Sequence, residues 1–100
     1  MLDLVVLQAC HSEIVGRVFQ KHCARHVICI DQDRAVLDDA SIKFTKNLYK
    51  NLLSGETICM AFDHAVSQAK IALGKGREHE TLRIFKLLLH EDYGQAPSLD

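Results

Sequence analysis

Two short runs of consecutive apolar residues constrain the fold of this chain most. One is Leu4–Leu7 within the segment Leu2–Ala9, and the other is Val27–Ile30 within Arg25–Ile30. In Leu2–Ala9 the continuous hydrophobicity, rather than alternation, predicts a strand buried on both faces, which favours a parallel sheet. A helical pattern from about Glu13 to His22 separates the two runs, as a parallel crossover connection requires. We therefore predict an α/β fold, with a partial parallel sheet flanked by helices.

The connecting helix is predicted from its cap and its periodicity. Ser12 has a side chain that can cap the helix at its first turn. Apolar residues then recur at helical spacing and define one apolar face. That face consists of Ile14, Val15, Val18 and Phe19.

Two longer helices and a final strand are expected in the second half. An unbroken i, i+4 line (Val36, Ala40, Phe44, Leu48, Leu52), with Leu37 and Tyr49 beside it, predicts a helix over about 35–54. Gly55 ends this helix at a position of positive φ, and Thr57 opens the next one. The inner face of that third helix is Ile58, Ala61, Phe62, Ala65, Ala69 and Leu73. Residues 74–77 form a loop, and for 82–90, where helix and strand are both compatible, we favour a strand.

Size and charge limit the function classes. The 100 residues fit one domain, and we assign 1–93 to it and 94–100 to a loose tail. Twelve basic against thirteen acidic residues, with no run of like charge, argues against nucleic acid as a partner. No stretch is long enough to span a membrane, and no basic leader precedes Leu4. Four cysteines without a leader are expected to be reduced, so we expect a cytoplasmic protein.

Cys10 is the candidate for chemistry. It lies between the predicted first strand and the helix, at the carboxyl edge where open α/β sheets bind ligands. The amino terminus of a helix lowers the pKa of a thiol and offers backbone N–H groups to an oxyanion. The alternative is that Cys10 is a small buried apolar side chain.

The residues around Cys10 resemble a known peptidase signature. Caspases have Gln-Ala-Cys followed by Arg, Gln or Gly and then Gly. This chain has Gln8-Ala9-Cys10 followed by His11 and Ser12. A hydrophobic strand ending in Ala-Cys, with a small hydroxyl residue soon after, is similar to the CHAT domains, which are related to caspases and separases.

Three later segments extend the resemblance to the CHAT family over roughly 4–72. The turn into the second strand, 23–28, is similar to the family's, and the acidic helix from Asp38 to Gly55 looks like the one that follows it. The next helix, with Ala61-Phe62, Ala65 and Ala69, resembles the family's alanine-bearing helix. The family's tryptophan after the second strand has no counterpart, because the chain contains no Trp.

The resemblance implies the carboxyl-terminal part of a caspase-like cysteine peptidase. Cys10 would be the nucleophile, His11 and Ser12 would flank it at the oxyanion site, and the substrate would be a protein or peptide. The family's catalytic histidine lies about 50 residues upstream of the cysteine, and only nine residues precede Cys10 here. The base would therefore come from outside this chain, and helical-repeat segments of a parent protein are possible partners.

No histidine of this chain is an obvious replacement. His11 is adjacent to Cys10, and a neighbour at such a turn usually points away from the thiol. We expect His22 and His26 at the opposite end of the sheet from Cys10. His90 can approach the site only if the last strand pairs favourably. His64 and His79 are expected on the surface.

Acidic residues gather after the second strand, on the edge that carries Cys10. Asp31, Asp33 and Asp38 are candidates for binding a basic substrate side chain. Alternatively, Asp38 and its neighbour Asp39 stabilise the dipole of the following helix.

A metal site is the second chemical possibility. Cys23, His26 and Cys29 recur every three residues, with His22 close by. That spacing suits a helix, whereas in the predicted strand His26 and Cys29 point to opposite faces. We therefore expect no metal and no other cofactor.

Two functions stay open. The first is an incomplete cysteine peptidase domain carrying Cys10. The alternative is a non-catalytic interaction or scaffold module derived from the same fold. In both, the strand 2–9 leaves a sheet edge unpaired, and such an edge predicts self-association.

Overall fold

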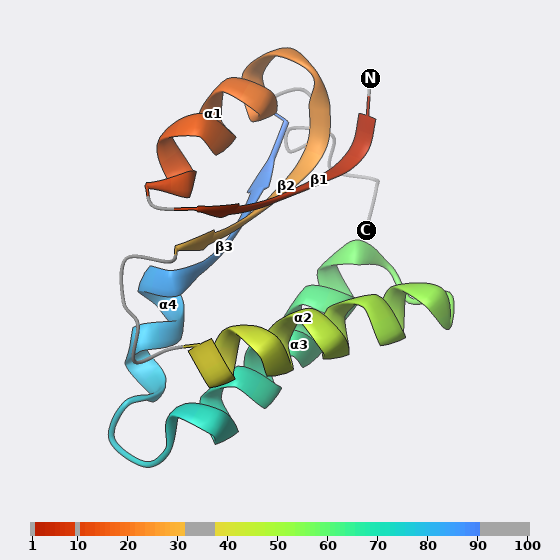
Figure 1. Cartoon of the computed structure of the whole chain (residues 1–100). Helices are drawn as coiled ribbons and strands as arrows, with labels where there is room; N and C mark the ends of the chain where they lie inside the picture. The colour runs from red at the N-terminus through yellow and green to blue at the C-terminus, as the bar shows by residue number, and fades with distance from the viewer. Residues whose placement is uncertain (1, 10, 32–37, 91–100) are drawn as a thin grey trace.

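The computed structural model describes residues 2–9, 11–31 and 38–90. It is a mixed α/β structure, which confirms the predicted fold class (Figure 1). In chain order the elements are β1 (Leu2–Ala9), α1 (Ser12–His22), β2 (Ala24–Asp31), α2 (Asp38–Leu53), α3 (Ile58–Leu73), the 3-10 turn η2 (Glu78–Glu80), α4 (Thr81–Ile84) and β3 (Phe85–Leu89). The predicted residues Val36 and Leu37 and the tail 94–100 lie outside the described residues.

The three strands form one sheet in the order β1-β2-β3. β1 and β2 are parallel, as predicted, with Leu4 opposite His26 and Ala9 opposite Asp31. β3 is antiparallel to β2, so the sheet is mixed rather than purely parallel. The carboxyl ends of β1 and β2 therefore lie at the same edge as the beginning of β3.

Helices cover both faces of the sheet. α1 lies on one face, and the α2–α3 pair lies on the other (Figure 1). β2 is the central strand, and its residues from Val27 to Ile30 are almost completely buried. Val27 and Cys29 belong to the core under α1, whereas Ile28 and Ile30 belong to the core under α2 and α3. β2 is thus buried on both faces.

The prediction that the strand 2–9 is buried on both faces is wrong for β1. Its middle residues are half-buried and both of its ends are exposed. The reason is its place in the sheet, because β2 is the one described strand that pairs with it. An apolar run indicates a strand, but it does not distinguish a central strand from one at the edge.

The predicted apolar face of α1 is largely turned away from the sheet. Ile14, Val15 and Val18 are 70%, 49% and 58% exposed. The residues buried against the sheet are instead the small ones, Ser12 and Gly16. A Cβ on Gly16 would overlap Cys29 Sγ and would stand 3.4 Å from Leu88 Cδ1 and Val27 Cγ1, so glycine permits this close approach.

α1 does not have Ser12 as its N-cap, although the sequence predicts it. The N-cap residue is His11, and no side chain makes a capping hydrogen bond there. Ser12 is the first residue of the helix and is 1% exposed. Its short side chain is therefore buried at the pocket and makes no capping hydrogen bond.

The helical hairpin follows the sequence pattern closely. Ala40, Phe44 and Leu48 of α2 are buried against Ala61, Ala65 and Ala69 of α3 in one core cluster. The Phe44 ring stacks on Phe85 at 4.2 Å between ring centroids. Gly55 has a φ of 98°, and the Thr57 hydroxyl accepts a hydrogen bond from the Met60 N–H at 3.2 Å, as the predicted helix end and cap require.

The segment 82–90 contains both of the structures that its sequence allowed. Its first residues complete α4, and β3 begins at Phe85, where the chain becomes extended. The favoured strand is therefore correct from Phe85 onward. In the described part of the chain, no helix is long and apolar enough to cross a membrane.

We predict that Gly16→Ala destabilises the protein. In an exposed helix this change would stabilise by up to about 1 kcal/mol. Here the added methyl overlaps Cys29 Sγ, and overpacking of a core typically costs about 1–3 kcal/mol. Urea denaturation gives the free energy of unfolding, and the double variant Gly16→Ala/Cys29→Ala should recover part of the loss. A single variant as stable as the original chain would contradict this packing.

Candidate functional site

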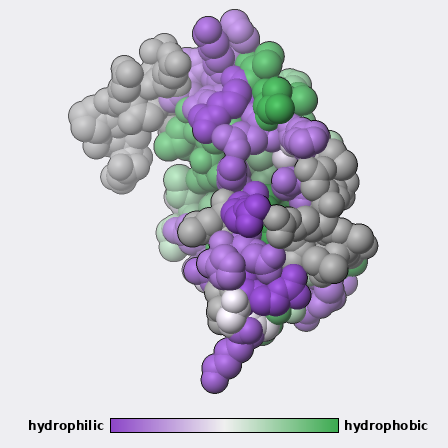
Figure 2. All heavy atoms as spheres, turned by 90° about the vertical axis from the view of Figure 1, so that its left-hand side faces the viewer, coloured by the Kyte–Doolittle hydropathy of each residue, from purple (hydrophilic) through white to green (hydrophobic). Residues whose placement is uncertain are grey.

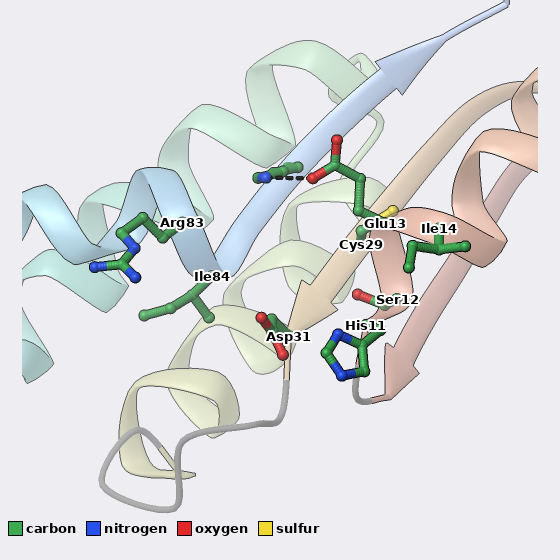
Figure 3. Close-up of a pocket in the computed structure, with 9 residues that line it drawn as sticks. His11, Ser12, Glu13, Ile14, Cys29, Asp31, Arg83 and Ile84 are labelled. Atoms are coloured by element: carbon green, nitrogen blue, oxygen red, sulfur yellow. Dashed lines mark hydrogen bonds and ion pairs between the residues drawn. The ribbon is translucent and has the colours of Figure 1, made fainter.

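A pocket opens where the carboxyl ends of the parallel strands meet the start of α1. Its volume is about 170 Å³, and its other wall comes from α4 and the beginning of β3 (Figure 3). This is the edge at which open α/β sheets bind their ligands. The lining residues are His11, Ser12, Glu13, Ile14, Cys29, Asp31, Arg83, Ile84 and Lys86.

The connection from β1 to α1 has an unusual backbone. His11 has φ 55° and ψ 36°, a left-handed conformation, and it is the one non-glycine residue with positive φ in the described part of the chain. Its carbonyl oxygen accepts a hydrogen bond from the Ile14 N–H at 3.1 Å. Such a conformation costs about 1–2 kcal/mol in an L-residue, and strain of this kind clusters at functional sites.

Cys10 lies in the sequence between Ala9, which ends β1, and this strained His11. Cys10 itself is outside the described residues. The four residues that follow it, from His11 to Ile14, all line the pocket. Its two neighbours in the chain are thus the end of β1 and the first residue of the pocket wall.

An ionic bridge ties the wall formed by α1 to the wall formed by β3. Glu13 accepts a hydrogen bond from the Lys86 ammonium and a second one, at 2.9 Å, from the Arg17 guanidinium. These two bonds hold the pKa of the Glu13 carboxyl below its usual value. Glu13 is therefore ionised at neutral pH, and it connects two segments that are far apart in the sequence.

Cys29 is the cysteine that lines the pocket among the described residues. Cys29 is 2% exposed, and its thiol is free. Burial, and to a lesser degree the charge of Glu13, raises the pKa of this thiol. Since the thiolate is the reactive form, Cys29 is a packing residue at neutral pH.

Groups of opposite charge stand on different walls of the pocket. Asp31 ends β2, and in Figure 3 it lies on the same side of the pocket as His11. Arg83 of α4 lines the wall formed by α4 and β3. A pocket with an acid on one wall and a guanidinium on another can hold a polar group that carries both hydrogen-bond donors and acceptors.

The structure brings together three of the residues singled out by sequence. His11, Ser12 and Asp31 all line the pocket. Cys10 and Asp33 lie outside the described residues. Asp38 is the first residue of α2 and is not among the residues that line the pocket.

Four polar or reactive residues of the pocket were missed by sequence reasoning. Glu13 sits in the first turn of the predicted helix, and this position was the only available signal for it. Cys29 was considered as a residue of the second strand and as a metal ligand, but not as part of this site. Arg83 and Lys86 reach the site because β3 runs antiparallel to β2. The local sequence carries no information on that strand direction.

The other described histidines lie away from the pocket. His26 is buried near the start of β2, with its ring Nδ1 3.1 Å from the Asp3 carbonyl oxygen. The His90 N–H donates to the Arg25 carbonyl at 2.9 Å, which fixes His90 at the far end of the sheet. The expectation for His26 is confirmed, and the pairing of β3 does not bring His90 to the site.

The remaining histidines occupy the surface. His22 ends α1 at that same far end and is exposed. His64 is paired with Glu56 at 2.9 Å, and His79 is exposed in η2. Among the described histidines, only His11 lines the pocket.

A metal site finds no support in the geometry. β2 forms as predicted, so His26 and Cys29, three positions apart on a strand, point to opposite faces. Within residues 2–9, 11–31 and 38–90, no group of three His, Cys, Asp or Glu side chains is arranged to hold a metal ion.

Comparison of the chain with models of protein families, with curated proteins and with solved structures finds no match.

We predict that Glu13 makes the stability depend on pH. Because the pKa of Glu13 is lowered in the folded state, its contribution is present above the pKa of the unfolded chain and is lost as the pH falls through the folded pKa. Glu13→Gln should therefore reduce the difference in unfolding free energy between pH 7 and pH 3. The reduction should stay below about 1 kcal/mol, because the pair is more than one third exposed. An unchanged difference would contradict the bridge.

Proposed function

We propose that the chain is the carboxyl-terminal portion of a cysteine peptidase domain of the CHAT type, with Cys10 as the nucleophile. The observation that carries the proposal is the strained left-handed residue His11, directly after Cys10, at the start of a helix that forms one wall of a pocket. A nucleophile on a tight strand-to-helix connection is well placed to face a bound carbonyl. The resemblance of 4–72 to the CHAT family supports the same assignment.

The chemistry expected of this site is attack of the Cys10 thiolate on a peptide carbonyl. Backbone N–H groups in the first turn of α1, at Ser12 and Glu13, can stabilise the oxyanion, because a helix leaves these donors without partners in the helix. Asp31 can bind a basic group of the substrate. The proton would be taken by a histidine that the described residues do not supply.

The free cysteines indicate the cellular compartment in which we expect the protein. Cys23, Cys29 and Cys59 are free. Reduced cysteines are typical of proteins in reducing compartments. They support a cytoplasmic location for this protein.

We predict that folding activates the thiol of Cys10. The helix terminus and the cation of Arg83 both favour a thiolate at the pocket. At pH 7 Cys10 should therefore react with iodoacetamide several-fold faster in the folded chain than in urea. The rate at each cysteine is measured by mass spectrometry of the resulting peptides.

Two other thiols of the chain serve as internal controls. Cys29 should react more slowly when folded, because burial raises its pKa. Cys59 is exposed on α3 and does not line the pocket. Its labelling rate therefore measures the effect of urea on the reagent itself. Equal or slower labelling of Cys10 in the folded state would exclude an activated thiol.

We predict that this chain alone does not turn over peptides. General-base assistance from the histidine that the family supplies upstream is worth about 10²–10⁴-fold in rate, and a favoured thiolate alone does not replace it. A fluorogenic peptide library should therefore give no signal above the Cys10→Ala variant. Turnover that Cys10→Ala abolishes would show that the chain contains its own base.

The alternative function is a non-catalytic interaction or scaffold module with the same fold. The observation in its favour is the exposed apolar side of α1, where Ile14 and Val18 are more than half exposed. Helical-repeat segments of a parent protein are candidate partners. Slow labelling of Cys10, together with a Cys10→Ser variant that binds its partners unchanged, would favour this module over the peptidase.

A further inference from the structure

The side chain of Ser12 is a buried polar group that the fold itself does not use. Ser12 is 1% exposed and lines the pocket, and its hydroxyl makes no hydrogen bond within the described part of the chain. Buried hydroxyls in native proteins are almost always hydrogen-bonded, so one without a partner calls for an explanation. In Figure 3 the oxygen of Ser12 points toward the middle of the lining residues. The hydroxyl is therefore aimed into the pocket.

Backbone donors lie beside this hydroxyl. α1 begins at Ser12 and is 11 residues long. The Ile14 N–H donates to the His11 carbonyl, whereas the N–H groups of Ser12 and Glu13 have no acceptor within the helix. The helix dipole adds positive potential at the same point. Together with the Ser12 hydroxyl, these donors favour a ligand with negatively charged oxygen atoms.

The charges around the pocket favour a ligand with a single negative charge. Glu13 is bound by two cations, Lys86 and Arg17, and a third cation, Arg83, lines the opposite wall. Asp31 brings a second carboxylate to the pocket. Among these described residues the surplus is one positive charge, which matches a monoanion. A phosphate dianion would be repelled by Asp31.

The size and the apolar part of the pocket define the rest of the ligand. The volume is about 170 Å³, below the roughly 300–1,000 Å³ of sites for drug-sized molecules. Ile14 and Ile84, which is 3% exposed, add apolar surface to the walls. In Figure 2, which turns the start of α1 and α4 toward the viewer, hydrophilic and hydrophobic surface lie side by side in the middle of the face. A short organic acid matches both kinds of surface.

We propose that the pocket binds the carboxylate group of a small organic acid, either a free molecule or the carboxyl terminus of a peptide. The Ser12 hydroxyl and the first N–H groups of α1 donate to the carboxylate oxygens, and the short apolar part of the acid lies against Ile84. Arg83 is exposed, and in Figure 3 its guanidinium is turned away from Ser12. It therefore contributes charge rather than a contact.

This binding holds whether or not Cys10 is a nucleophile, because it uses described residues alone. The N–H groups of Ser12 and Glu13 are also the oxyanion donors of the proposed peptidase, so a bound acid competes with that reaction. Binding is therefore measured directly. Cys10→Ala removes the thiol and should bind the acid as well as the original chain does, so a failure of the peptidase function leaves the binding result unchanged.

Titration of the full chain with butyrate tests the proposal. The amide NMR signals of Ser12 and Glu13 should shift, with a dissociation constant on the order of 1 mM for so small a molecule. Butyramide has the same shape without the charge, and it should bind about tenfold more weakly or worse, as should inorganic phosphate. A short peptide with a free carboxyl terminus, compared with its carboxamide, distinguishes a terminal carboxylate from a free acid.

Ser12→Ala removes the buried hydroxyl and should weaken butyrate binding by about tenfold, because hydrogen bonds to charged groups are strong. Since this hydroxyl has no partner in the free protein, the variant should be no less stable to urea. Arg83→Gln, at an exposed position, removes the surplus charge and should also weaken binding. Ser41→Ala is the matched control, because Ser41 is 7% exposed on α2 and does not line the pocket.

Three results would each overturn the proposal. The first is butyrate that shifts no signal or binds no better than butyramide. The second is phosphate that binds more tightly than butyrate. The third is Ser12→Ala that binds as the original chain does, or that loses no more than Ser41→Ala.

Discussion

Both layers of helices in this protein have the central strand β2 in their cores. Its residues alternate between the two cores, with Val27 and Cys29 under α1 and Ile28 and Ile30 under the helical hairpin. Neither helical layer has another fully buried strand to cover, because β1 is half-buried. The placement of α1, and with it one wall of the pocket, therefore depends on the packing of β2.

Much of the fold can be predicted from the sequence because its signals are local. The strands 2–9 and 24–31, the helix ends at Gly55 and Thr57 and the buried line Ala40, Phe44 and Leu48 follow from periodicity and turn chemistry. The orientation of α1 does not follow. Its larger apolar residues predict the buried side, whereas the close approach at Gly16 buries the small residues instead. Periodicity identifies an apolar side but not which element covers it.

The candidate site also has one part that the sequence predicts and one part that it does not. Its α1 wall and Asp31 could be found from sequence, because a strand end followed by a helix start is a local pattern. Its other wall, with Arg83 and Lys86, depends on β3 returning antiparallel to β2. That pairing is a contact between distant segments, and nothing in residues 82–90 specifies its direction. Cys10, on which the proposed chemistry depends, follows the last residue of β1 in the sequence and precedes His11 of the pocket.

The helical hairpin has a consequence for the order of folding. The connection from α2 to α3 spans only residues 54–57, so closing it costs little chain entropy. Contacts between neighbours in sequence form faster than distant ones, and the hairpin can therefore form before the sheet is complete. β3 is the last of the described strands to emerge during synthesis, and a nascent chain that ends before Phe85 lacks the described partner on one edge of β2. During synthesis, the central strand is thus the part of the protein most open to pairing with a wrong partner.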